Sequence, residues 1–246
     1  MSSVVIAKQF RGPPNQGNGG YVAGVIGREF KGPATAIIRA PVPLDTPLTM
    51  ERRDDGDLAI MNGETLVLFG KPATKADLPD VPPAPTLEEA RAAGALSPVL
   101  EKPIHPPCFS CSNLREEGDG LRVCNGQLEG REPGHSACIW TPHANFADAE
   151  GRAPVEVVWA ALDCPGSIAW MIKGNRVGLL GRMTGEVIER PKVGEEHIVM
   201  AWPMEIEGRR HFAGVALFTK DGKLLARGKQ IWIAFTPREG EQARPR

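Results

Sequence analysis

The stretch "PVEVVWAALDCPGSIAWMI", residues 154–172, is apolar around nearly its whole circumference when it is drawn as a helix. A helix of this kind is buried inside a protein and does not lie on its surface. The elements that follow it must therefore surround it, which predicts an α+β protein whose antiparallel sheet wraps a central helix. The apolar positions that carry this prediction are Val155, Val157, Val158, Trp159, Ala160, Ala161, Leu162, Ile168, Ala169 and Trp170.

β-like runs stand on both sides of this helix. Four follow it, and the last two of these are joined by Lys220-Asp221-Gly222-Lys223, a strong hairpin pattern. The N-terminal part repeats the order of strand, glycine-rich helix and then strands separated by proline and Asp-Asp-Gly turns. The expected strands lie at 4–7, 34–44, 47–53, 57–70, 120–130, 135–142, 176–188, 195–208, 209–222 and 223–235.

Residues 72–107 differ from the rest of the chain, because nine of its 23 prolines lie there. Such density excludes a paired central strand and favours extended or turning backbone. One helix is expected inside it, at 86–96, where Thr86 and Glu89 form a capping box and Gly94 weakens the far end. This segment is interpreted as a linker that wraps the surface of the fold.

Bulk composition restricts the class of protein. The 246 residues are 41% hydrophobic and 24% charged with a net charge of −1, which is typical of a globular protein with a substantial core. No Lys/Arg cluster indicates a nucleic-acid surface. The N-terminus is too weakly apolar for a signal peptide, and no run is expected to reach the roughly 18–20 residues of a membrane span. The odd cysteine count, five, argues against a disulfide scaffold, so a cytoplasmic location is expected.

The glycine-rich stretch "FRGPPNQGNGGYVAGVIG", residues 10–27, begins the N-terminal helix. Unpaired amides at a helix start attract anionic groups, and Gly19 and Gly20 allow a ligand to approach them closely. Asn15 and Asn18 could bind that ligand, with Tyr21 beside them, or the stretch is a plain Asn-capped helix with a flexible entry. A dinucleotide site is excluded because Val22 stands where the third glycine is required, and no phosphate-binding loop motif occurs.

Together these patterns resemble the hotdog fold of acyl-CoA thioesterases and dehydratases. The most similar part is 185–234, where "P-x-x-G-E" precedes a hairpin and "DGKLLARG" precedes the final strand; "GNGGYVAGVI" is a weaker match. The resemblance implies a tandem, double-hotdog arrangement, each unit an antiparallel sheet around a central helix. It divides the chain into an N-terminal half (1–71), the linker (72–107) and a C-terminal half (108–246).

The resemblance gives roles to the two helix starts. In this family a glycine pair holds the thioester carbonyl, which matches Gly19 and Gly20, and an acidic residue activates water or attacks directly, which matches Asp163. The first half lacks the acid and the second lacks the glycines, so a composite site across both halves is expected. Alternatively, Asp163 caps a helix that Pro165 and Gly166 break. The hydratase branch of the fold requires a histidine where Ile168 stands, which disfavours that chemistry.

The cysteines offer a second chemistry. In "HPPCFSCSNL", His105, Cys108 and Cys111 have metal-like spacing, and Cys124 follows. Zinc needs four ligands, which His105 or His135 could complete; otherwise these are small buried apolar side chains. Cys164 has no histidine near it in sequence, which disfavours a nucleophilic pair.

The resulting hypothesis is a thioesterase-like enzyme that hydrolyses an acyl-CoA or related thioester by carboxylate-assisted attack of water, with no metal or redox cofactor. A non-catalytic acyl-CoA or small-ligand binding protein on the same scaffold is the alternative, because fold does not fix chemistry. A zinc-stapled assembly module is a third reading. The expected partner is an acyl-CoA-type small molecule, and the two-unit chain could either remain a monomer or associate further through its sheet edges.

Overall fold

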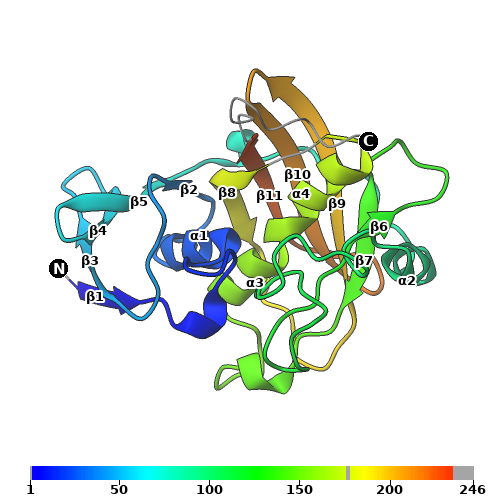
Figure 1. Ribbon diagram of the computed structural model, residues 1–246, viewed down its shortest axis with the longest axis horizontal. Coiled ribbons are helices and arrows are strands. Elements are labelled where there is room, and N and C mark those ends of the chain that lie inside the picture. The colour runs from blue at the N-terminus through cyan, green and yellow to red at the C-terminus, as the bar shows by residue number, and fades with distance from the viewer. Residues whose placement is uncertain (1, 176–177, 235–246) are drawn as a thin grey trace.

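The computed structural model describes residues 2–175 and 178–234. Within them, eleven strands form one sheet in the order β1-β3-β4-β5-β2-β8-β11-β10-β9-β7-β6, and each pair of neighbours is antiparallel. Figure 1 shows this sheet curving around helices near the centre of the molecule. The expected α+β class, with buried helices wrapped by an antiparallel sheet, is confirmed.

The N-terminal strands occupy one end of the sheet. They are β1 (Ser2–Val5), β2 (Ala34–Ile38), β3 (Pro47–Arg52), β4 (Leu58–Asn62) and β5 (Thr65–Pro72), and they lie beside helix α1 (Gly19–Gly27). The single run expected at 57–70 is instead the β4–β5 hairpin. Its turn is Gly63-Glu64, where Gly63 has a φ of +57°, a conformation that glycine adopts without strain.

The proline-rich segment carries α2 (Leu87–Ala95). Thr86 accepts from the backbone N–H of Glu89, and the Glu89 side chain accepts from the backbone N–H of Thr86, so the predicted capping box is confirmed. The Ala90 and Ala93 side chains are buried where this helix packs against the sheet near β7. The segment therefore packs on the outer surface of the C-terminal strands.

The remaining strands build the larger end of the sheet: β6 (Gly126–Gln127), β7 (Ser136–Trp140), β8 (Leu179–Val187), β9 (His197–Glu207), β10 (Arg210–Thr219) and β11 (Leu224–Ile233). The predicted β10–β11 hairpin forms around the Asp-Gly turn. Arg176, Val177 and Phe235, which the sequence assigned to strand runs, lie outside the described residues. β2 pairs with β8, and this pairing makes one sheet of the two groups of strands.

The apolar stretch at 154–172 forms two helices and not one. α3 (Val155–Ala161) and α4 (Asp163–Ile172) meet at Leu162. Pro165 explains the break, because it cannot donate to the carbonyl of Ala161 and its ring crowds that turn. The Gln230 side chain donates to the carbonyls of Leu162 and Asp163, at 2.6 and 3.0 Å, and stabilises the interrupted turn.

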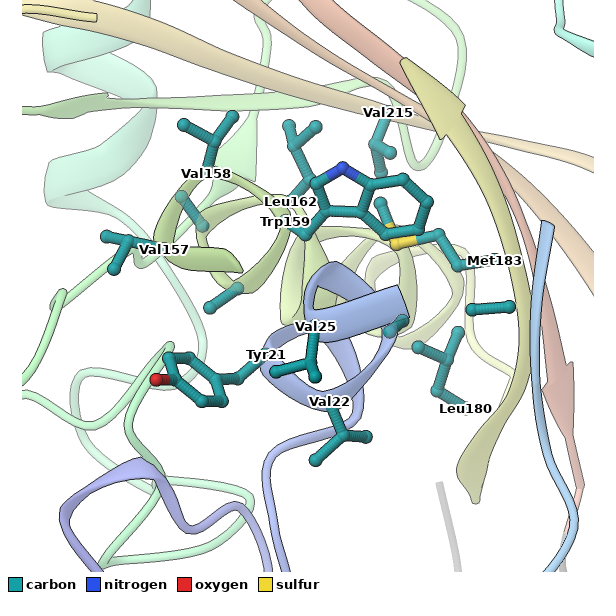
Figure 2. Close-up of a cluster of buried hydrophobic side chains, with 14 of the residues drawn as sticks. Tyr21, Val22, Val25, Val157, Val158, Trp159, Leu162, Leu180, Met183 and Val215 are labelled. Carbon is teal, nitrogen blue, oxygen red and sulfur yellow. The ribbon is translucent and has the colours of Figure 1, made fainter. Parts of the chain in front are cut away.

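The core lies between α1, α3 and the sheet. Gly20, Gly24 and Gly27 lie on the face of α1 that contacts α3, where a Cβ would approach Trp159 or Glu156 to 2.9 Å or less. Figure 2 shows the Trp159 side chain of α3 on one side of α1 and the Val22 and Val25 side chains of α1 on another side. The glycine-rich sequence therefore lets two helix backbones approach closely.

Val155–Ile172 has the length and apolar composition of a membrane span. This corrects the expectation that no run of the sequence is long and apolar enough to cross a membrane. However, 78% of this stretch is buried inside the protein. That burial is typical of the core helices of soluble proteins.

Candidate functional site

Two helix starts meet at the centre of the molecule. Asn18 precedes α1 and Asp163 begins α4, and the Asn18 Nδ2 donates to the Asp163 Oδ2 at 2.7 Å. Both side chains are buried, with exposed fractions of 1% and 3%. The Asn18 Oδ1 accepts from the backbone N–H of Tyr21 at 2.9 Å, so its amide nitrogen is left to face the carboxylate. Capping α1 thus fixes the orientation of the group that holds Asp163.

The surroundings of Asp163 favour its protonated form. Burial is the largest cause and raises the pKa to about 7, with a further contribution from Cys108. The Gly20 backbone N–H and the Asn18 amide lower it in part. Within residues 2–175 and 178–234, the Asp163 Oδ1 has no hydrogen-bond partner. The carboxyl group is therefore held by one oxygen and can accept a proton with the other near neutral pH.

A cavity of about 350 Å³ reaches this pair. Asn18, Gly19 and Asp163 form part of its wall, next to Cys108 and Cys164. Its other walls combine apolar side chains with a few polar and basic ones: Gln16, Val22, Ile38, Arg39, Val42, His105, Ser167, Leu180, Arg209, Trp232 and Ile233. Mostly apolar walls with a few convergent polar groups are typical of a small-molecule site.

The predicted ligand-binding residues occupy different positions. Gly19 is on the cavity wall, and Gly20 is buried, where a Cβ would lie 2.4 Å from the Trp159 carbonyl oxygen. Asn15 is exposed and is not part of the described cavity wall. The Tyr21 ring stacks on Phe10 with 3.9 Å between centroids. The structure thus brings Asn18, Gly19 and Gly20 to Asp163 and leaves the side chains of Asn15 and Tyr21 in other surroundings.

A thiol cluster adjoins the carboxylate. The Sγ atoms of Cys108, Cys111 and Cys164 lie within 4.8 Å of one another, and those of Cys108 and Cys164 are 3.5 Å apart. Thiols of the other two cysteines donate to Cys108 and lower its pKa. Cys124, part of the set suggested by the sequence, instead donates its thiol to the carbonyl of Cys111 at 3.3 Å.

The loop that carries Cys108 and Cys111 is attached to the helix break. The Ser110 hydroxyl donates to the carbonyl of Ala160 at 2.6 Å, which joins the loop to the end of α3. Cys164 lies just beyond the break, in the first turn of α4. Its place beside the Cys-x-x-Cys pair depends on this long-range contact and could not be deduced from spacing.

Gln230 and Trp232 of β11 hold the helix break next to Asp163 in position through hydrogen bonds, and the sequence did not predict this role for either residue. The Trp232 Nε1 donates to the Gln230 Oε1 at 2.9 Å, which orients the Gln230 amide toward the break. Gly166 lies against the same group, and a Cβ there would come within 1.8 Å of the Gln230 oxygen. The alternation of Ala226, Gly228, Gln230 and Trp232, which puts a glutamine on the apolar face of β11, was the signal that could have indicated this role.

Comparisons with known proteins support the fold. The sequence matches no protein-family profile and no curated protein. A protein provisionally described as a thioesterase from Novosphingobium aromaticivorans DSM 12444 has 12% identity and a TM-score of 0.64, over 95% of both chains. The tesB protein of Mycobacterium avium subsp. paratuberculosis has 12% identity and a TM-score of 0.61, over 95% of this chain and 92% of that one.

A third similar structure is a conserved protein of unknown function with a hot dog fold from Alicyclobacillus acidocaldarius. It has 14% identity and a TM-score of 0.61, over 96% of this chain and 93% of that one. At such identities the similarity establishes the fold. The chain therefore has the hotdog fold that the sequence resemblance predicted.

Proposed function

We propose that this protein hydrolyses an acyl-CoA or related thioester, with Asp163 as the general base. The observation that carries the proposal is the buried carboxyl group on the cavity wall, fixed through Oδ2 by Asn18 while Oδ1 is without a partner in the described residues. A base whose pKa is near 7 matches the pH at which it would work. Water placed at Oδ1 gives its proton to Asp163 as its oxygen attacks the thioester carbonyl.

The start of α1 is the proposed site for the negative charge that develops on the carbonyl oxygen. Amides in the first turn of a helix have no partner within that helix, and Asn18 already takes that of Tyr21. Gly19 lies on the cavity wall beside Asp163, and its backbone N–H is the proposed donor to the carbonyl oxygen. The Gly20 backbone N–H is directed toward the Asp163 carboxylate and acts by lowering the pKa of that group. The intermediate then expels the thiolate, and the proton held by Asp163 returns to that sulfur.

The same proposal includes the tandem arrangement: a hotdog-like half at 1–71, a linker at 72–107 and a second half at 108–246. Strands β1–β5 are neighbours in the sheet and come from the same part of the chain as α1. Strands β6–β11 form the other contiguous group and come from the same part of the chain as α3 and α4, which supports this division. Asn18 and Gly19 come from one half and Asp163 from the other. A cytoplasmic location and self-association are further parts of this proposal.

A panel of acyl-CoA esters of differing chain length tests the activity, with release of free CoA thiol as the readout. A sample of protein without ester corrects for its own five cysteines. If no ester is hydrolysed while a non-hydrolysable thioether analogue binds, the alternative of a binding protein replaces the enzyme.

The rate should depend on pH through Asp163. Its carboxyl group must be ionised to accept a proton, so kcat/KM should rise up to about pH 7 and level off above it. Below that point each unit of pH should cost about tenfold, because the ionised fraction falls tenfold. Chelator-treated protein assayed from about pH 5 to about pH 9 measures this, and a flat profile would exclude Asp163 as the base.

Asn18→Ala should move this profile to higher pH. The variant loses the α1 cap, which costs about 1 kcal/mol of stability, and it removes the hydrogen bond that lowers the pKa of Asp163. Thr86→Ala is the matched control, because it removes the α2 cap far from the carboxylate. Denaturant unfolding should show similar losses for both variants, while only Asn18→Ala shifts the pH midpoint; equal midpoints would contradict the positioning role.

A further inference from the structure

The thiol cluster has the ligand type and the close spacing that a metal ion requires. We propose that Cys108, Cys111 and Cys164 together bind one thiophilic divalent cation of the zinc class, with the fourth ligand supplied from the cavity. The three Sγ atoms lie within 4.8 Å of one another, and all three side chains are buried. This site adjoins Asp163 on the same cavity wall, takes no part in the hydrolysis proposed above, and uses Cys164 in place of Cys124.

The distances between the sulfur atoms fit tetrahedral coordination. Zinc–sulfur bonds of about 2.3 Å place the sulfurs of such a site about 3.8 Å apart. The Cys108 and Cys164 sulfurs are 3.5 Å apart, and the others are within 4.8 Å. Small side-chain rotations are therefore sufficient to reach bonding distance from a common centre.

The groups around the cluster also suit thiolates. The backbone N–H groups of Ser110 and Cys111 are directed at the Cys108 sulfur, and the Asn18 Nδ2 lies 3.8 Å from it. Such donors orient a ligating sulfur and stabilise its negative charge. Ser110 also holds the Cys-x-x-Cys loop against the helix break, so the two chain segments meet at a fixed position before any ion arrives.

An entry path exists because Cys108 and Cys164 lie on the cavity wall. His105 is on the same wall, and a water molecule or this imidazole can complete four-fold coordination. Binding converts three thiols and a divalent ion into a tris-thiolate complex and releases up to three protons. No electron is transferred.

Cobalt titration of the reduced, chelator-treated full-length chain tests the site. Co²⁺ should bind at one ion per chain and give a sulfur-to-cobalt charge-transfer band, which Zn²⁺ should then abolish. Cys164→Ser should weaken Zn²⁺ binding by about a hundredfold or more, at or beyond the upper end of what loss of a second-shell partner costs. Cys138→Ser is the matched control, because this buried thiol donates to Asn125 outside the cluster and its loss should leave the affinity unchanged.

Several results would overturn the proposal. One is the absence of a cobalt–thiolate band in the wild-type protein. Another is a loss of affinity in Cys124→Ser with no loss in Cys164→Ser, which would indicate the ligand set suggested by the sequence spacing. A Cys108–Cys164 disulfide in the isolated protein, with no metal bound after reduction, would instead identify a redox pair. If circular dichroism shows that Cys164→Ser does not fold, the Zn²⁺ affinity of Cys111→Ser and the cobalt–thiolate band of the wild-type protein test the proposal instead.

Discussion

Asp163→Asn should lower kcat for the best acyl-CoA ester by about 10² to 10⁴-fold, the usual contribution of a general base. The asparagine keeps the size of the side chain and can still accept from the Asn18 amide, so the cavity keeps its shape. Affinity for a non-hydrolysable thioether analogue should therefore be unchanged. Steady-state assays beside calorimetric titration with the analogue measure the two effects separately.

Stability distinguishes this result from unfolding. Above about pH 7 the wild-type protein holds a buried ionised carboxylate, whose burial opposes the charged form. The folded state binds the proton more tightly than the unfolded state, so wild-type stability falls as pH rises from about 4 to about 7. Asp163→Asn should lose this dependence and unfold at the same or a higher temperature near pH 8. Asp221→Asn, in the exposed β10–β11 turn, should change neither property, and full activity in Asp163→Asn would refute the mechanism.

Gly20→Ala should destabilise the protein by about 3 kcal/mol, the upper part of the usual range for overpacking. The added Cβ would lie 2.4 Å from the Trp159 carbonyl oxygen and 2.5 Å from the Asp163 Cβ, so α1 must move away from the helix break. The intrinsic gain of alanine over glycine in a helix, about 1 kcal/mol, is smaller than this cost. Denaturant unfolding at constant pH measures the difference.

Gly19→Ala is the control for this effect, because it lies one residue earlier in the same helix. Its Cβ would meet the Leu180 Cβ at 3.0 Å and the Leu180 Cδ2 at 3.2 Å, so β8 would have to move by only a few tenths of an ångström. Its stability should stay within about 1 kcal/mol of the wild-type value. Equal destabilisation in the two variants would mean that the close approach of α1 to α3 does not set the cost.

Local sequence patterns predicted those elements that are determined by residues close together in the sequence. The Asp221-Gly222 hairpin and the Thr86–Glu89 capping box formed as expected, since each depends on residues a few positions apart. The sequence offered the helix break only as an alternative, through Pro165 and Gly166, because its position at Leu162 also depends on the Gln230 side chain, 68 residues away. The β4–β5 turn was missed because only two residues, Gly63 and Glu64, interrupt an otherwise continuous β-like run.

The candidate site was predictable only in part. Asp163 was conspicuous as a carboxylate within an apolar helix, and the glycines before Tyr21 marked the other helix start. The hydrogen bond between Asn18 and Asp163 joins positions 145 residues apart, so no local pattern indicates which way the amide points. The placement of Cys164 beside Cys108 has the same origin, with 56 residues between them.

The position of β11 in the sheet has a consequence for how the protein acquires its site. This strand, the last in the described chain, lies between β8 and β10, and it carries Gln230 to the helix break. During synthesis the earlier strands and helices emerge first, yet the centre of the sheet is incomplete until β11 inserts. Contacts of such long sequence separation fold slowly. Recovery of the Asp163 environment after dilution from denaturant should therefore follow insertion of this strand, and helix formation should precede both.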